Sequence, residues 1–155
     1  MNPGQFQRQL EQNVIAPVYL FQGDPGLLQD EAWAHLRQKL VPRTASRFNG
    51  EKLQARACTA AQVLDRLRSA PMFGSKRLLM VEQIEDWAKD QRQTMQSFLS
   101  EPHSTSCLVL TAVKKKGIEA IEAAVARIGQ IVSFSPPNER EAPRWLQLRA
   151  KIYRK

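Results

Sequence analysis

The sequence of 155 residues has little cysteine and no long hydrophobic run. Its two cysteines, Cys58 and Cys107, lie far apart, without a CxxC pair or a nearby pair of histidines, so neither a disulfide framework nor a metal site is expected. The longest apolar stretch, residues 107–113, is far shorter than the ~20 residues that cross a bilayer. The first residues lack the basic segment and apolar stretch of a signal peptide. These absences predict a cytoplasmic protein with reduced thiols and no membrane contact.

Common catalytic patterns are also missing. The sequence contains neither a GxSxG elbow nor an HExxH motif, and nothing ties His35 or His103 to a nucleophile. We therefore expect no catalytic activity, no cofactor and no metal.

Positive charge is present in excess, with a formal net charge of +8 and a pI near 9.9. The excess is densest in residues 138–155. Such a balance favours a polyanionic partner, most plausibly nucleic acid, although charge that only maintains solubility is an equally good interpretation of composition alone.

Strand-like and helix-like stretches alternate along the chain after a polar, glutamine-rich lead-in. Helical spacing of apolar residues predicts helices from Leu27 to before Pro42, from a Thr59 cap to before Pro71, over 89–99, and over 118–128 up to Gly129. Apolar runs predict strands at 17–21, 46–49 (closed by Gly50), 77–81, 107–113 and 131–134. This order predicts an α/β fold with a five-stranded, mostly parallel sheet flanked by helices.

A domain boundary is predicted at the two adjacent prolines, Pro136 and Pro137. Residues 1–136 would form the first domain. Residues 137–155 would be a linker followed by the first helix of a truncated second domain, with Trp145, Leu148 and Ile152 along one side of that helix.

The first strand ends at Gly23, where a phosphate-binding loop with the pattern GxxxxGK[ST] would begin. Leu28, Gln29 and Asp30 stand at the positions of the second glycine, the lysine and the hydroxyl residue. The cation and the magnesium ligand are missing, and Asp30 would repel phosphate. Glu82, at the end of the third strand, is therefore read as a solvated acid rather than as a magnesium-binding residue.

An apolar pair, Met72 and Phe73, stands between Pro71 and Gly74 in a connection between a helix and a strand. Exposed at a loop tip, such a pair would anchor a partner, and its truncation would cost on the order of 2 kcal/mol or more. The more ordinary interpretation is that both side chains fold back and close the core.

Three consecutive lysines, Lys114, Lys115 and Lys116, follow the fourth strand. They could contact phosphate, together with Arg149 and Lys151 of the C-terminal helix. More often such a triplet is a solvated turn.

Residues 18–31, 48–51, 70–81 and 106–110, followed by Trp145, resemble in this order segments of the bacterial clamp-loader delta subunit, a component of DNA polymerase III. The most telling segment is Ala70-Pro71-Met72-Phe73-Gly74, which precedes a basic residue and the third strand. The resemblance implies an AAA+-like, P-loop-NTPase-like domain with a degenerate phosphate loop that has lost ATP binding. It also implies that the second domain is lid-like.

For function, the resemblance implies that Met72 and Phe73 insert into a pocket of the ring-shaped sliding clamp, and that binding favours the open ring. Other loader subunits and primed DNA would be the further partners. Two features depart from the family. Arg68 stands where some relatives have glutamine, and the chain is about half the usual length.

Two other hypotheses remain open. One is a basic nucleic-acid-binding domain without a clamp-loading role, and the other is a diverged nucleotide-binding enzyme. The clamp-binding hypothesis alone accounts for both the lost phosphate loop and the apolar pair.

Overall fold

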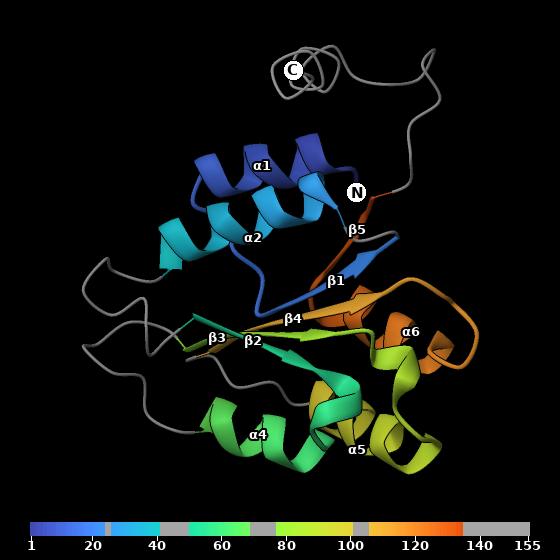
Figure 1. Cartoon of the computed structure of the whole chain (residues 1–155). Helices are drawn as coiled ribbons and strands as arrows, with labels where there is room; N and C mark the ends of the chain where they lie inside the picture. The colour runs from blue at the N-terminus through green and yellow to red at the C-terminus, as the bar shows by residue number, and fades with distance from the viewer. Residues whose placement is uncertain (24–25, 41–49, 69–76, 101–105, 135–155) are drawn as a thin grey trace.

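The computed structural model describes residues 1–23, 26–40, 50–68, 77–100 and 106–134 (Figure 1). Its strands are β1 (Val18–Gln22), β2 (Gly50–Gln54), β3 (Arg77–Glu82), β4 (Ser106–Ala112) and β5 (Gln130–Ser133). Its α-helices are α1 (Pro3–Glu11), α2 (Leu27–Leu40), α4 (Ala60–Arg68), α5 (Lys89–Leu99) and α6 (Glu119–Ile128). Two short 3-10 turns, η2 (Ala55–Ala57) and η4 (Ile84–Asp86), follow β2 and β3.

All five strands run parallel in one sheet, in the order β2-β3-β4-β1-β5. The connection from β1 crosses toward β2 with α2 on one face, and the later connections run the other way with α4, α5 and α6 on the opposite face (Figure 1). Right-handed crossovers require this change of face when the direction of travel reverses. The predicted α/β fold with a parallel sheet is confirmed.

The alternation of strand side chains produces two hydrophobic cores. Successive residues of a strand point to opposite faces, so each buried strand contributes to both layers. The core under α4, α5 and α6 receives Val18, Leu20, Leu79, Val81, Leu108 and Leu110. The core under α1 and α2 receives Tyr19, Phe21, Leu78, Met80, Cys107 and Val109. The strands that read as continuous apolar runs are therefore those buried on both faces.

Helix α1 forms in the polar, glutamine-rich lead-in, to which the sequence analysis assigned no helix or strand. Asn2 forms a capping box with Gln5, since the Gln5 N–H donates to Asn2 Oδ1 at 2.8 Å and the Asn2 N–H donates to Gln5 Oε1 at 2.9 Å. Pro3 occupies the first turn. Phe6 and Leu10, one turn apart, are buried in the second core. The capping box and this spacing were readable in the sequence, but the glutamine-rich composition obscured them.

Strand β2 also lies later in the chain than the predicted second strand. Gly50, which was expected to close that strand, is the first residue of β2. It pairs with β3 at one edge of the sheet, and its residues are half-buried or exposed. An edge strand of this kind carries few apolar side chains, so the apolar-run criterion missed it. The predicted strand residues 46–49 lie outside the described residues.

The predicted end of α6 at Gly129 is confirmed, but the reason differs from the usual one. Gly129 has a φ of −143°, which any residue can adopt. A Cβ at this position would collide with the backbone carbonyl of Val18. Glycine is needed here because the chain passes directly against β1, not because the helix ends in a left-handed residue. The Thr59 cap of α4 is also confirmed, since the Gln62 N–H donates to Thr59 Oγ1 at 3.1 Å.

Among the described residues, none of the helices is both long and apolar enough to cross a membrane. The predicted domain boundary and residues 137–155 lie outside the described part of the chain.

Candidate functional site at the carboxyl edge of the sheet

Because the strands are parallel, their carboxyl ends meet at one edge of the sheet. β1 and β4 are neighbours there, and the chain leaves them toward opposite faces, into α2 and α6. Doubly wound sheets bind ligands at such a switch point. This edge is therefore the place to test for a nucleotide site.

Gly23, at the end of β1, is fixed in position by contacts with other parts of the protein. Its N–H donates to the Ala112 carbonyl at 3.0 Å. Its φ of +122° is in a region that L side chains rarely adopt, and a Cβ would lie 2.7 Å from the Phe134 carbonyl oxygen. The glycine is thus required for close packing between β1 and the end of β5, whether or not a phosphate binds.

Gln29 stands where a phosphate-binding lysine would be and turns back onto the loop. The side chain is buried, and its Nε2 donates to the Gly23 carbonyl at 3.3 Å. The next residue, Asp30, is largely exposed and lies 3.8 Å from Lys52 Nζ, which stands 5.8 Å from the Trp33 ring centroid. In place of a cation and a magnesium-binding hydroxyl, the first turn of α2 offers a neutral amide that is already bonded and a carboxylate paired with Lys52 of β2.

The end of β3 is also closed by an internal hydrogen bond. Glu82 is half-buried at the strand end, and Gln83, with a φ of 58°, turns the chain into η4. The Gln83 N–H donates to Oγ1 of the buried Thr111 at 3.0 Å. Within the described residues no group of three or more histidine, cysteine or acidic side chains could hold a metal ion. Glu82 therefore stands without companion ligands in this part of the chain.

Residues 113–117, which we call the lysine loop, follow β4 at the same edge. The N–H groups of Val113 and Lys114 both donate to Glu85 Oε2, at 2.7 and 2.8 Å. At the other end of the loop, Gly117 has a φ of +91°. Its N–H donates to Glu119 Oε2 at 2.9 Å, and its carbonyl accepts from Arg92 Nη1 at 2.8 Å. Both ends of the loop are therefore fixed by side chains of neighbouring elements.

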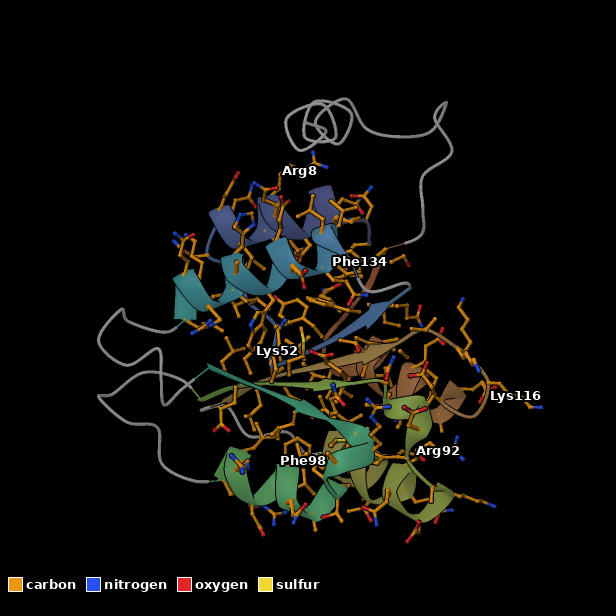
Figure 2. All side chains as sticks on the ribbon, viewed as in Figure 1. Arg8, Lys52, Arg92, Phe98, Lys116 and Phe134 are labelled. Atoms are coloured by element: carbon orange, nitrogen blue, oxygen red, sulfur yellow. The ribbon has the colours of Figure 1, made fainter. Side chains whose placement is uncertain are left out.

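The predicted lysines Lys114, Lys115 and Lys116 are all exposed in this loop. Figure 2 shows Lys116 extending outward from the molecule, on the same side as Arg92. The sequence identified these lysines but gave no sign of Glu85 and Arg92, which help to hold the loop, because these two residues come from η4 and α5, more than 20 residues earlier in the chain.

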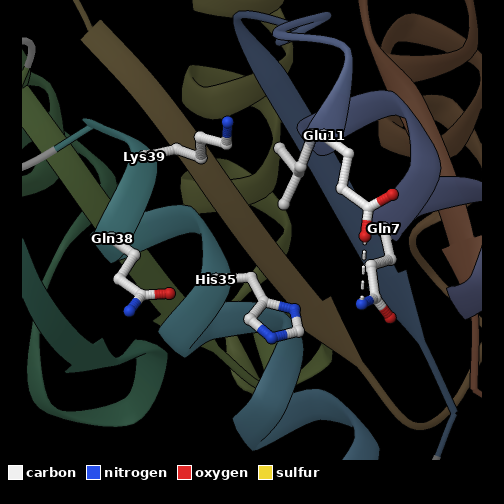
Figure 3. Close-up of a pocket in the computed structure, with 6 residues that line it drawn as sticks. Gln7, Glu11, His35, Gln38 and Lys39 are labelled. Atoms are coloured by element: carbon white, nitrogen blue, oxygen red, sulfur yellow. Dashed lines mark hydrogen bonds between the residues drawn. The ribbon is translucent and has the colours of Figure 1, made fainter.

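A groove of about 520 Å³ lies between α1 and α2, away from the predicted sites (Figure 3). Its lining combines polar and apolar surface, and comprises Gln7, Leu10, Glu11, His35, Gln38 and Lys39. Gln7 Nε2 and Glu11 Oε1 bond to each other at 3.5 Å (Figure 3). The groove places one histidine and one lysine beside amide side chains. Such a lining is an ordinary solvated surface between two helices.

Burial raises the pKa of two side chains in the scaffold. The pKa of Tyr19 is raised to about 12 by burial, although a hydrogen bond from the Ala16 N–H, at 2.9 Å, lowers it in part. Burial likewise raises the pKa of Cys58, and the nearby Arg66 lowers it. Both cysteines are free thiols, as the sequence analysis predicted.

The predicted apolar anchor and its neighbours lie outside the described residues. These are Ala70, Pro71, Met72, Phe73 and Gly74, and the C-terminal residues Arg149 and Lys151 lie outside as well. The elements that bound the anchor segment are described. Helix α4 ends at the exposed Arg68, one residue after the buried Leu67, and β3 begins at Arg77, one residue before the buried Leu78.

Comparison with known proteins gives one family. The profile described as DNA polymerase III, delta subunit, matches residues 19–127. No curated protein sequence matches the chain.

Solved structures with similar folds include the Bacillus subtilis DNA clamp loader delta protein YqeN, at 19% identity and a TM-score of 0.76 over 89% of this chain and 44% of that protein. A Thermotoga maritima protein related to the DNA polymerase III gamma subunit matches at 14% identity and 0.59, over 90% of this chain and 48% of that one. Thermotoga maritima RuvB matches at 14% identity and a TM-score of 0.57, over 88% of this chain and 43% of that protein. The fold is AAA+-like, and this chain spans less than half the length of each of these proteins.

Proposed function

Since the chain belongs to the DNA polymerase III delta subunit family, we propose that it carries the clamp-binding module of a clamp loader. The observation that carries this proposal is the family match over residues 19–127, in a domain where Gln29, at the position of the phosphate-binding lysine, bonds back to the Gly23 carbonyl. A module that need not bind ATP can serve as a fixed binding surface. Its partners would be the sliding clamp and the other loader subunits, with primed DNA in the assembled complex, in the cytoplasm.

In this proposal the chain makes and breaks no covalent bond. It would bind the open ring more tightly than the closed ring, and the equilibrium would shift only by the difference between those affinities. A shift from mostly closed to mostly open requires a ratio of up to about 10⁴, or ~5.5 kcal/mol. ATP hydrolysis by other subunits would then reverse the binding.

Met72 and Phe73 are proposed as the anchors that fill the pocket on the clamp. The segment that contains them leaves α4 after Arg68 and enters β3 at Arg77. Both flanking elements are anchored in the core by Leu67 and Leu78. Since β3 begins at the amino edge of the sheet, this segment rejoins the domain at the edge opposite the lysine loop. Arg68 is exposed beside it, at the place where some relatives have glutamine, and would supply a polar contact to the clamp in its stead.

The test is calorimetric binding to the sliding clamp of the same organism. A Met72→Ala/Phe73→Ala variant that remains folded is expected to lose at least tenfold in affinity, about 1.4 kcal/mol. The matched control is Val14→Ala/Leu27→Ala, which removes two exposed apolar side chains elsewhere, 51% and 47% exposed. Equal losses in both variants, or no binding by the unaltered protein at micromolar concentration, would contradict the proposed site.

The competing hypothesis is a basic nucleic-acid-binding domain without a clamp-loading role. The observation in its favour is the exposed, internally fixed lysine loop. This hypothesis expects tight DNA binding with a steep salt dependence and no binding to the clamp. Measuring the two partners separately distinguishes it from the clamp-binding proposal.

A further inference from the structure

We propose that the lysine loop is a binding surface for the phosphodiester backbone of DNA, and that Glu85 is the positioning residue that holds it in shape. This site is separate from the clamp contact. It would operate whether or not Met72 and Phe73 bind a clamp.

The first part of the argument is the rigidity of the loop. Glu85 Oε2 accepts from two successive backbone N–H groups, so one carboxylate fixes the start of the loop with two charge-assisted hydrogen bonds. Arg92 and Glu119 fix the far end through the carbonyl and the N–H of Gly117. A loop fixed at both ends loses less conformational entropy on binding than a free one.

The second part is what the fixed loop presents. The ammonium groups of three consecutive lysines stand on an exposed stretch, and none of them forms a salt bridge within the described residues. Lysine is a compact point charge, which suits contact with phosphates irrespective of base sequence. The net charge of +8 adds a general attraction to a polyanion.

Carboxylates on the neighbouring elements limit the range of that attraction. Glu85 and Glu119 are turned onto backbone N–H groups of the loop, and Asp86, Asp90 and Glu122 lie on η4, α5 and α6. At physiological salt the Debye length is about 8 Å, so direct lysine–phosphate contacts are felt mainly at short range. The site should therefore act through a few local contacts rather than through a wide positive field.

The test measures binding of a short fluorescein-labelled DNA duplex by anisotropy, between about 50 and 200 mM salt. The variant Lys114→Gln/Lys115→Gln/Lys116→Gln is expected to bind more weakly. Its plot of log affinity against log salt should be shallower by up to about 2.7, which is ~0.9 for each lost phosphate contact. The control Arg8→Gln/Arg56→Gln/Arg127→Gln removes the same charge from exposed positions elsewhere and should keep the slope.

Glu85 is tested by two substitutions that remove the same negative charge. Glu85→Gln keeps an oxygen that can accept from Val113 and Lys114, whereas Glu85→Ala does not. A positioning role predicts that Glu85→Ala weakens DNA binding several-fold and that Glu85→Gln retains it. If charge alone mattered, both substitutions would tighten binding equally, and that result would overturn the role assigned to Glu85.

The lysine variants change only exposed side chains, so they test the surface even if Glu85→Ala does not fold. Equal changes of slope in the lysine variant and the arginine control would mean that only net charge matters, and the site would be refuted. An unchanged slope in the lysine variant would also refute it, and would leave the loop available to an acidic protein partner.

Discussion

Helix α1 lies before residue 19, where the family match begins. Replacing Phe6 tests whether this helix is nevertheless part of the folded domain. Phe6 is 1% exposed, and its ring lies edge-on to Tyr19 at 5.1 Å and to Phe21 at 5.5 Å between centroids. Truncating a buried phenylalanine to alanine costs about 3–5 kcal/mol. Each edge-to-face pair contributes about 0.5–1.5 kcal/mol of the packing energy. For Phe6→Ala we expect a loss of about 3–4 kcal/mol in the free energy of unfolding.

The assay is urea denaturation followed by circular dichroism. Two further variants serve as comparisons, and both should cost less than Phe6→Ala. Phe6→Leu keeps most of the buried volume and loses the ring contacts, so it should cost about 1–2 kcal/mol. Arg8→Ala lies on the exposed side of the same helix and should stay within about 0.5 kcal/mol of the unaltered protein. If Phe6→Ala were no more destabilising than Arg8→Ala, α1 would not be packed as described, and the reasoning would fail.

Two further predictions concern the scaffold. Gly129→Ala should destabilise the fold by about 1–3 kcal/mol in urea denaturation, since the added Cβ would collide with the Val18 carbonyl. The control Gly26→Ala should be neutral or slightly stabilising, because no atom lies within 4 Å of the Cβ added there. Equal effects of the two substitutions would refute the close approach of Gly129 to Val18. Tyr19, with its pKa raised to about 12, keeps its proton in the folded state at a pH where the unfolded chain, near 10, has lost it. The contribution of the protonated Tyr19 hydroxyl to the free energy of unfolding is therefore complete below pH ~10 and declines by about 2–3 kcal/mol as the pH rises to 12. The free energy of unfolding of the unaltered protein should fall relative to that of Tyr19→Phe in that range. If the difference between the two proteins stayed constant, it would contradict the burial of the hydroxyl.

The buried strands were predictable from the sequence because they are apolar on both faces. Residues 77–81 and 107–113 read as continuous apolar runs, and β3 and β4 lie where those runs were found. The failure at β2 has the opposite cause, since an edge strand with half-exposed side chains has no such run. The loss of the phosphate-binding residues was also readable, because Leu28, Gln29 and Asp30 are fixed by their distance from Gly23.

For the candidate site, the sequence identified the three lysines and not what holds them. Glu85 precedes the lysine loop by 28 and 29 residues in its two hydrogen bonds, and Arg92 precedes Gly117 by 25. Spacings of that size carry no local signal. The contacts arise only when η4 and α5 are brought beside the end of β4.

The sequence alone determined the alternation of strands and helices, the parallel arrangement that follows from it, and the loss of the lysine and hydroxyl residues of a phosphate-binding loop. These depend on local periodicity and on residue identity, which are properties of short segments. Only the tertiary structure decided that Gln29 bonds back to Gly23, that Gly129 must pass against Val18, and that Glu85 shapes the lysine loop. Each of these depends on a contact between segments, and the free energy of such a contact exists only once both segments are in place.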